Sequence, residues 1–283
     1  MKRRVKLGLL GNNLGRSRAK NLHELLGEIY HLEVTYEPID LVDRPGPVSI
    51  GEELQRCRTL GYRGVNVTHP YKREALDFVT VMAGFPEGLS SVNTVLFKGQ
   101  EMLADNTDYT GCCRSFTKLF SSGFKPGRVL MLGAGGVGVS IGFALREAGA
   151  GELVIFDIRE ALAKTLAEQL QGGPMTVRVS GPDLLEEMSR ADGLVNATPI
   201  GMFQYPGNPF PSEGFASQSW AFDAVYTPEN TEFLDTCRKK GIRTLSGFYL
   251  FLYQGLDAFR HFTTIQADAE LVEPAFLERF PLE

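Results

Sequence analysis

The chain has few of the residues that build disulfide frameworks or metal centres. Its 283 residues include 4 cysteines and 4 histidines. Because His23, His69 and His261 lack metal-ligand or triad spacing, we expect structural or solvent-exposed roles for them. No cluster has the spacing of zinc ligands, so no metal is expected. The thiols are expected to be reduced and mostly buried, namely Cys57, Cys112, Cys113 and Cys237.

The chain also lacks long apolar runs and an excess of either charge. No apolar stretch approaches the ~20 residues that span a bilayer. Met1–Arg4 is followed only by the short run Val5–Leu10, which is typical of a strand rather than of a signal peptide. The 29 basic and 34 acidic side chains give a formal net charge of -5, which provides no footprint for nucleic acid. We expect a cytoplasmic monomer or homodimer with neither membrane nor nucleic-acid partners.

A regular alternation of strand-like and helix-like segments follows the Gly- and Pro-containing linker 123–127. Such alternation predicts a doubly wound parallel sheet of the Rossmann type, with helices on both faces. The expected strands are 128–132, 152–156, 176–179, 193–196 and 220–223, and the expected helices are 137–148, 160–169, 183–189 and 231–240.

The first part of the chain predicts a separate α/β domain. The helical segment from Gly247 to Phe262, and the residues after it, follow no recognisable strand and are expected to return to this domain. The predicted domains are 1–107 plus 247–283, and 108–246. The N-terminal strands are expected at 5–11, 34–41, 64–68 and 91–97, with a hairpin through 102–104, and helices at 21–30, 52–60, 72–82 and 110–121.

The stretch GVNVTHPYK, residues 64–72, carries the first chemical signal. Its valines are expected on the buried face of a strand, which places Asn66 and Thr68 on the other face, where a hydroxylated ligand can be read. The proline then ends the strand and opens a helix over 72–82. Lys72, in the first turn of that helix, is the predicted proton-transfer residue.

A glycine-rich turn follows the strand 128–132 and precedes a helix. Its G-x-G-x-x-G spacing allows a tight turn and lets the backbone approach a pyrophosphate at the positive end of the helix. We predict a dinucleotide site formed by Gly133, Ala134, Gly135, Gly136, Val137 and Gly138.

Asp157 and Arg159 bear on which dinucleotide binds. Asp157 ends the second strand about 20 residues after the turn, where a carboxylate accepts hydrogen bonds from the adenosine ribose. Because this carboxylate repels a 2'-phosphate, NAD is favoured over NADP. The Arg159 guanidinium can stack on adenine or tolerate that phosphate, so NADP stays open as the alternative.

Five further stretches occur in a characteristic order. They are Ser90–Val95, Asp105–Asp108, Asn196–Met202, Asp223–Pro228 and Gly247–Gln254. Together with residues 64–72, which are similar to a G-x-N-V-T-x-P-x-K motif, they resemble the successive motifs of the shikimate dehydrogenase family. The resemblance covers nearly the whole chain.

This resemblance implies a two-domain oxidoreductase that passes a hydride between a nicotinamide and a ring carbon bearing a secondary alcohol or ketone. Lys72 and Asp108 match the family's catalytic pair.

Thr198, in the third motif, and Gly247, where the family chain meets the nicotinamide, are predicted cofactor residues. Tyr226 follows a strand end on the edge facing the expected cleft and is a candidate substrate residue. The family's positions that bind the ring hydroxyls correspond to Asn66, Thr68, Asn93 and Gln254. The family's position that holds the substrate carboxylate corresponds to Ser17.

The carboxylate loop departs from the family pattern of two serines around one residue, followed by a proline. Ser17 is retained, but Ala19 and Lys20 replace the second serine and the proline. Losing a hydrogen bond to a charged group costs about 1.5–3 kcal/mol. Either Arg16, Arg18 or Lys20 supplies a replacement, or the substrate differs at that end. A quinate or quinate/shikimate dehydrogenase, or a paralogue acting on a related cyclitol carboxylate, therefore fits better than the biosynthetic NADP enzyme.

Two other interpretations stay open. A methylene-tetrahydrofolate dehydrogenase-like enzyme also uses a lysine near a dinucleotide domain, although the polyol-reading residues speak against it. A non-catalytic dinucleotide sensor is the second, although such a sensor needs neither Lys72 nor Asp108.

Overall fold

The computed structural model describes residues 2–42, 44, 46–120, 123 and 125–281. Its contacts divide the chain into two compact units. Unit 1 comprises Met1–Thr107 with Gln254–Pro281, and unit 2 comprises Asp108–Tyr253. Two residues of the predicted elements, at positions 121 and 124, lie outside the described residues.

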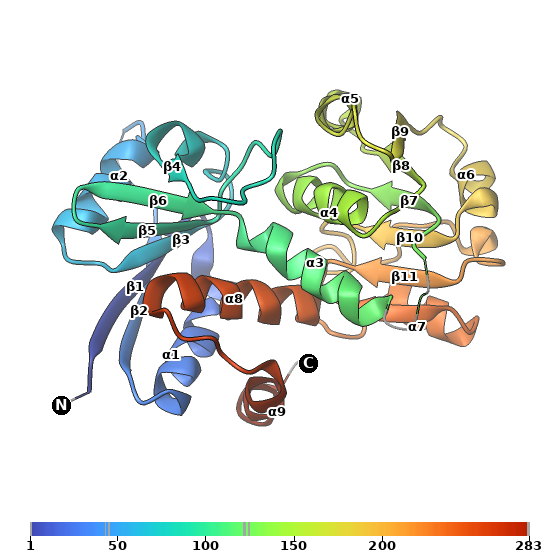
Figure 1. Cartoon of the computed structure of the whole chain (residues 1–283). Coiled ribbons are helices and arrows are strands. Elements are labelled where there is room, and N and C mark those ends of the chain that lie inside the picture. The colour runs from blue at the N-terminus through green and yellow to red at the C-terminus, as the bar shows by residue number, and fades with distance from the viewer. Residues whose placement is uncertain (1, 43, 45, 121–122, 124, 282–283) are drawn as a thin grey trace. The chain divides into compact units, whose positions relative to one another are not determined.

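Unit 1 is built on a mixed six-stranded sheet (Figure 1) with the order β2-β1-β3-β5-β6-β4. β5 runs antiparallel to both of its neighbours. The carboxyl ends of β3 and β6 therefore meet the beginning of β5 at one edge of the sheet. The strands are β1 (Arg4–Gly11), β2 (Glu33–Asp40), β3 (Gly64–Val67), β4 (Thr80–Val81), β5 (Thr94–Lys98) and β6 (Glu101–Asp105).

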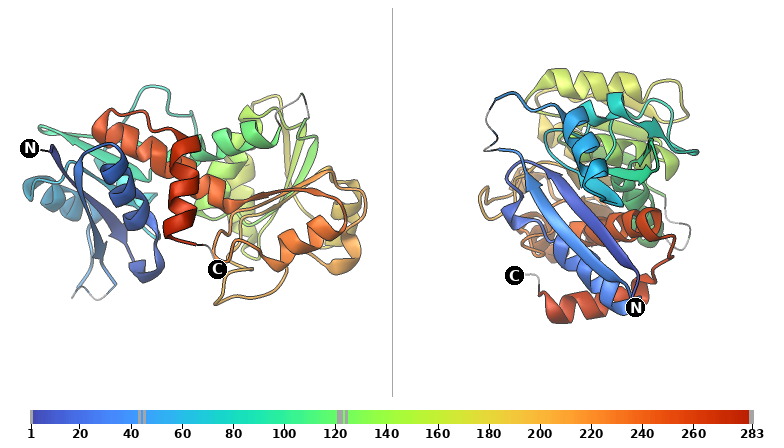
Figure 2. Two further views of the ribbon diagram at one scale, coloured as in Figure 1. Left: turned by 90° about the horizontal axis from the view of Figure 1, so that it is seen from below. Right: turned by 90° about the vertical axis from the view of Figure 1, so that its left-hand side faces the viewer.

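Helices cover both faces of this sheet. On one face, α1 (Ala19–Ile29) and the later part of α8 (Gly247–Thr263) pack on β1 and β2, and α9 (Ala269–Arg279) contacts α1 (Figure 2). On the other face, α2 (Ile50–Thr59) and the 3-10 helix η2 (Glu74–Phe78) pack on β3 and β5. A second 3-10 helix, η1 (Leu14–Arg16), lies between β1 and α1.

Unit 2 contains a parallel six-stranded sheet with the order β12-β11-β10-β7-β8-β9. When the strands of this unit are numbered 1 to 6 along the chain and the sheet is read from β9, the order is 3-2-1-4-5-6, the Rossmann order. The strand order reverses between β7 and β10. The strands are β7 (Arg128–Leu132), β8 (Glu152–Phe156), β9 (Thr176–Val179), β10 (Gly193–Asn196), β11 (Trp220–Asp223) and β12 (Arg243–Ser246).

Helices also cover both faces of the unit 2 sheet (Figure 1). α6 and α7 contribute to an apolar core with β7, β10 and β11. On the opposite face, Phe116 of α3 packs edge-on against Trp220 and Phe222 of β11. The helices are α3 (Thr107–Leu119), α4 (Gly136–Glu147), α5 (Glu160–Gln169), α6 (Leu184–Arg190) and α7 (Glu232–Lys239), with the 3-10 helix η3 (Ser212–Gly214).

Two secondary-structure predictions are wrong. The predicted helix over 72–82 is a turn followed by η2, and the chain then extends into β4. The β-branched run at 79–81 favours a strand, and Thr80 and Val81 pair with β6. The segment before Gly247 does contain a strand, β12, which has four residues, two of them polar or charged at its ends.

Candidate functional site

Unit 1 gathers polar side chains where β3 and β6 end and β5 begins. The Tyr36 hydroxyl donates to Asn66 Oδ1 at 2.9 Å, and Asn66 Nδ2 donates to Thr94 Oγ1 at 2.9 Å. Asn66 Nδ2 also donates to the carbonyl of Asn93 at 3.3 Å. The backbone N–H of Thr107 donates to Asn93 Oδ1 at 2.6 Å. All five residues are buried and uncharged, and we call them the amide–hydroxyl network.

The prediction placed Asn66 on one face of β3 and said nothing of its burial. The alternation along β3 is as expected, because Val65 and Val67 belong to the core under α2. The opposite face is also covered, however, because α1 and α8 pack on it. Asn66 is therefore only 6% exposed, and it lies within a hydrogen-bonded network rather than on an open face.

The turn after β3 carries Thr68 and Lys72, and both side chains are half-buried. The Thr68 N–H donates to the Leu10 carbonyl at 2.8 Å, and the Lys72 carbonyl accepts from the Val92 N–H at 2.9 Å. The second bond ties the backbone of Lys72 to the segment that leads into β5. The turn therefore lies beside the amide–hydroxyl network.

The remaining predicted residues of this group lie on helices. Asp108 follows the network residue Thr107 in the first turn of α3, where it is 8% exposed. Gln254 is half-buried on α8. By contacts Asp108 belongs to unit 2, whereas Lys72 and Gln254 belong to unit 1.

The loop that carries Ser17 is fixed by a carboxylate. Asp40, at the end of β2, accepts from the backbone N–H groups of Leu14 at 2.8 Å and Asn13 at 3.1 Å. These hydrogen bonds, first that of Leu14, lower the pKa of Asp40. Ser17 itself is exposed, and its Oγ accepts from the Ala19 N–H at 3.3 Å. Its hydroxyl hydrogen can therefore still be donated to a ligand.

Arg18 and Lys20, both proposed as replacements for the carboxylate ligand, have partners in unit 1. Arg18 Nη1 donates to the carbonyls of Phe280 at 3.1 Å and Pro281 at 2.9 Å. Lys20 lies 3.9 Å from Glu24 in an exposed i,i+4 pair. Arg16 is exposed at the end of η1.

In unit 2, the glycine turn stands between β7 and α4, as the motif predicts. Gly133 has φ +100°, and a Cβ there would lie 2.6 Å from the carbonyl oxygen of Ala197, the residue after β10. A Cβ on Gly138 would lie 2.4 Å from the Gly133 oxygen. At Gly135, by contrast, a Cβ meets nothing within 4 Å among the described residues. The turn therefore closes tightly on β10 but leaves space at Gly135, which fits a pyrophosphate approached by backbone.

Asp157 joins the turn to the loop after β8. Its Oδ2 accepts from the Ala134 N–H and its Oδ1 from the Arg159 N–H, both at 2.8 Å. The side chain of Asp157 is 8% exposed, whereas that of Arg159 is 72% exposed, 3.9 Å from the carboxylate. Each carboxylate oxygen has a further lone pair, so Asp157 can still accept a hydroxyl.

Two loops of unit 2 are tied by residues that open two of the recognised motifs but were not selected as site residues. Asn196 ends β10, and its Nδ2 donates to Asp223 Oδ1 at 2.9 Å. Asp223 ends β11 and also accepts from the Thr231 hydroxyl at 2.6 Å. Burial raises the pKa of Asp223 to about 7, against the hydrogen bonds that it accepts. The available signal was that each is the last residue of a predicted buried strand.

The other predicted residues of unit 2 lie around these loops. The Thr198 hydroxyl donates to Asn196 Oδ1 at 2.6 Å. The half-buried Tyr226 stacks on Phe251, with ring centroids 4.7 Å apart. A Cβ on Gly247 would lie 2.4 Å from the Ala224 oxygen, so only glycine allows this close approach.

Sequence reasoning also missed the supports of the unit 1 network. Tyr36 stacks on His23 of α1, with centroids 4.7 Å apart and planes 8° from parallel. Burial lowers the pKa of His23 to about 3, so the imidazole is neutral. His261 Nε2 lies 2.9 Å from Asp105 Oδ2. Because these contacts join residues far apart in sequence, no local pattern marks them.

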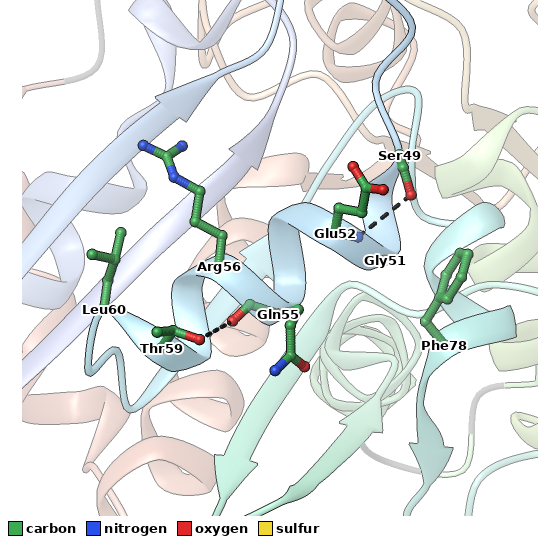
Figure 3. Close-up of a pocket in the computed structure, with 8 residues that line it drawn as sticks. All are labelled: Ser49, Gly51, Glu52, Gln55, Arg56, Thr59, Leu60 and Phe78. Atoms are coloured by element: carbon green, nitrogen blue, oxygen red, sulfur yellow. Dashed lines mark hydrogen bonds between the residues drawn. The ribbon is translucent and has the colours of Figure 1, made fainter.

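A hollow of about 660 Å³ lies on the surface of α2 (Figure 3). Its lining includes Glu52, Arg56 and Phe78, and none of the sequence-predicted site residues lines it. Within the described part of the chain, no group of three or more His, Cys, Asp or Glu side chains is placed to hold a metal. None of the described helices is both long and apolar enough to cross a membrane.

Comparison with known proteins connects these features. Residues 9–95 match the model of the shikimate dehydrogenase substrate binding domain. A shikimate dehydrogenase (NADP(+)) of Pseudarthrobacter chlorophenolicus is 38% identical over 281 residues, covering 96% of this chain and 94% of the relative. A quinate/shikimate dehydrogenase (NAD(+)) of Corynebacterium efficiens is 34% identical over 278 residues, covering 96% of this chain and 98% of the relative. The solved structure of quinate dehydrogenase from Corynebacterium glutamicum in complex with NAD has a TM-score of 0.87 at 31% identity, covering 98% of this chain and 100% of that one.

The strand order, the glycine turn and the carboxylate after β8 define a two-unit α/β protein with a Rossmann-type dinucleotide-binding fold, as predicted. On the identity to its relatives over nearly its full length, the chain belongs to the shikimate dehydrogenase family of NAD(P)-dependent oxidoreductases. The predicted resemblance is therefore confirmed.

Proposed function

We propose that this chain passes a hydride between NAD(P) and the secondary alcohol or ketone of a hydroxylated cyclic carboxylic acid, such as quinate or shikimate. The observation that carries the proposal is the amide–hydroxyl network of unit 1. Uncharged amides and hydroxyls suit a polyol, because they supply hydrogen-bond donors and acceptors without imposing one charge. Unit 1 is thus the proposed substrate domain, and unit 2 the proposed NAD(P) domain.

Lys72 is the proposed acid–base residue, with Asp108 as its partner. Removing hydride from a carbinol requires that the hydroxyl proton be taken as well, and a positioned side chain contributes roughly a hundredfold to ten-thousandfold to such a step. Lys72 takes this proton or holds the alkoxide as it forms. Asn66, Thr68, Asn93 and Gln254 bind the ring oxygens in this proposal.

The glycine turn and Asp157 are proposed to hold the dinucleotide, which supplies the hydride acceptor or donor. Thr198, Gly247 and Tyr226 complete the proposed site on unit 2. NAD is the proposed preference, because Asp157 accepts from a free ribose hydroxyl and repels a 2'-phosphate. The NAD named for the Corynebacterium relative supports this preference, whereas the Pseudarthrobacter relative is named for NADP.

The carboxylate of the acid is proposed to bind at Ser17. Because Ala19 removes one hydroxyl from this loop, and because Arg18 and Lys20 have other partners, this end supports a quinate-like acid better than shikimate alone. The substitution Ala19→Ser restores the missing hydroxyl and is expected to shift preference toward shikimate.

Steady-state reduction of NAD and NADP, followed by absorbance with quinate, shikimate and an amino-substituted analogue, tests the proposal. We expect turnover with NAD and quinate or shikimate. Measurable NAD binding without reduction by any of these acids would instead support a dinucleotide sensor or a different substrate. We further propose a cytoplasmic monomer or homodimer, which cell fractionation and light scattering of the purified protein test.

A further inference from the structure

The amide of Asn66 has one orientation that satisfies its neighbours. The carbonyl of Asn93 can only accept a hydrogen bond, so the atom of Asn66 that faces it is Nδ2. Nδ2 donates its second hydrogen to Thr94 Oγ1. Oδ1 then faces Tyr36, whose hydroxyl donates to it at 2.9 Å. The amide is therefore held at both ends.

This orientation determines what Asn66 and Asn93 can offer a ligand. Both hydrogens of Asn66 are used within unit 1, and one lone pair of Oδ1 remains. Asn93 shows the opposite polarity, because its Oδ1 accepts from Thr107 and Thr94. Asn66 is thus an acceptor and Asn93 a donor toward the same edge of the sheet. A hydroxyl group satisfies both polarities, whereas a keto oxygen has no hydrogen to donate to Asn66.

Tyr36 is itself held rigidly. Its ring is 2% exposed and stacks almost parallel on the buried imidazole of His23. Phe259 and Phe262 of α8 surround that imidazole, with ring centroids 6.2 and 5.9 Å away. The position of the Tyr36 hydroxyl is consequently set by packing between α1, which carries His23, and α8, which carries Phe259 and Phe262.

We propose that Tyr36 is a positioning residue that fixes the Asn66 amide, so that unit 1 selects a substrate with a hydroxyl rather than a keto group opposite Asn66. This inference rests on the proposed function for its substrate, but the orientation of the amide can be measured without turnover.

The experiment compares Tyr36→Phe with wild type by hydrogen exchange of the Asn66 side-chain amide, measured by NMR. Loss of one hydrogen bond predicts exchange that is roughly fivefold to tenfold faster. In steady-state assays, KM for the acid is expected to rise by a similar factor, while KM for NAD stays unchanged because unit 2 is untouched.

Tyr62→Phe is the matched control. Tyr62 is also a buried tyrosine of unit 1 that donates to a side chain, Glu37, but it precedes β3 at the end away from Asn66. Unchanged Asn66 exchange in Tyr36→Phe, or a KM increase equal to that of Tyr62→Phe, would overturn the inference. If wild type oxidises none of the acids, the proposed function fails, and the exchange measurement alone decides whether Tyr36 fixes the amide.

Discussion

The amide–hydroxyl network of unit 1 and the strand-end loops of unit 2 are stabilised by different chemistry. In unit 1, neutral amides and hydroxyls such as Asn66 and Thr94 hold one another's side chains. In unit 2, the carboxylates of Asp157 and Asp223 hold loops, largely through backbone N–H groups. The first arrangement fixes the orientation of individual side chains, and the second fixes the course of the backbone. This difference suits a polyol read by side chains and a pyrophosphate read by main chain.

The largest expected effect separates turnover from dinucleotide binding. Lys72→Ala is expected to lower kcat roughly a hundredfold to ten-thousandfold, because the proton loses its acceptor, and to leave the Kd for NAD unchanged. Single-turnover kinetics and calorimetry measure the two quantities. Lys98→Ala, in an exposed position at the end of β5, is the control and is expected to match wild type. Unchanged turnover in Lys72→Ala would contradict the assignment of Lys72 as the acid–base residue.

Two glycine substitutions test whether unit 2 depends on backbone geometry. Gly133→Ala combines a positive φ with an approach of 2.6 Å to the Ala197 oxygen, so we expect the free energy of unfolding to fall by about 2–4 kcal/mol. Gly135→Ala meets no described atom within 4 Å and is expected to change it by less than about 0.5 kcal/mol, yet to weaken NAD binding. Urea unfolding and NAD titration measure these effects. Equal stability losses would show that the turn is not selectively closed at Gly133.

The units are expected to respond to pH with opposite signs. The pKa of His23 falls from 6.5 to about 3 on folding, so below pH 6.5 the unfolded chain binds a proton that the folded chain does not. The contribution of neutral His23 in unit 1 to the free energy of unfolding is therefore lost as pH falls toward 3. The pKa of Asp223 rises from 3.8 to about 7, so the folded chain keeps a proton that the unfolded chain releases. The contribution of protonated Asp223 in unit 2 to the free energy of unfolding is therefore lost as pH rises from about 4 to 7.

For each of these two groups, the free energy of unfolding is expected to change by up to about 1.4 kcal/mol per pH unit between its unfolded and folded pKa. Unfolding by urea at several pH values, with His23→Phe and Asp223→Asn compared separately with wild type, isolates each contribution from the other titrating groups. The difference in the free energy of unfolding between wild type and variant is expected to change with pH in one direction for His23→Phe and in the opposite direction for Asp223→Asn. The same sign for both would contradict the proposed protonation states.

The smallest expected effect concerns the loop that carries Ser17. Asp40→Asn replaces one accepting oxygen with a donor and so removes hydrogen bonds to the loop backbone. Because the site is exposed, KM for the acid is expected to rise only about twofold to fivefold, with KM for NAD unchanged. Glu33→Gln, at the opposite end of β2, is the control and is expected to leave both values unchanged.

The same contrast explains what the sequence could predict. The Gly133 turn and Asp157 were predicted because their spacing to flanking strands is local and fixed by the fold. The assignment of Asn66 to a face of β3 followed from alternation, but its burial depended on α8, about 190 residues later. Tyr36 escaped notice because its partner Asn66 lies 30 residues away, on a strand that is not its neighbour in the sheet.

Short elements were the other difficulty. β12 has four residues, of which only Leu245 is apolar, so no apolar run marks it. β4 has two residues, too few for periodicity to separate a strand from a helix or loop. The helix predicted from Lys72 failed for this reason, because pairing of Thr80 and Val81 with β6 outweighed the proline signal. The roles of Lys72 and Asp108 stay predictions, since they rest on the family's motifs.

The Arg18 contacts also have a consequence for the timing of folding. Arg18 donates to carbonyls 262 and 263 residues later in the chain. During synthesis from the N-terminus, these bonds cannot form until residue 281 has emerged from the ribosome, and closing so long a loop is slow. The contacts of Asp157 with the glycine turn span only 23 residues. A nascent chain can therefore order its glycine turn well before it secures the loop that carries Ser17.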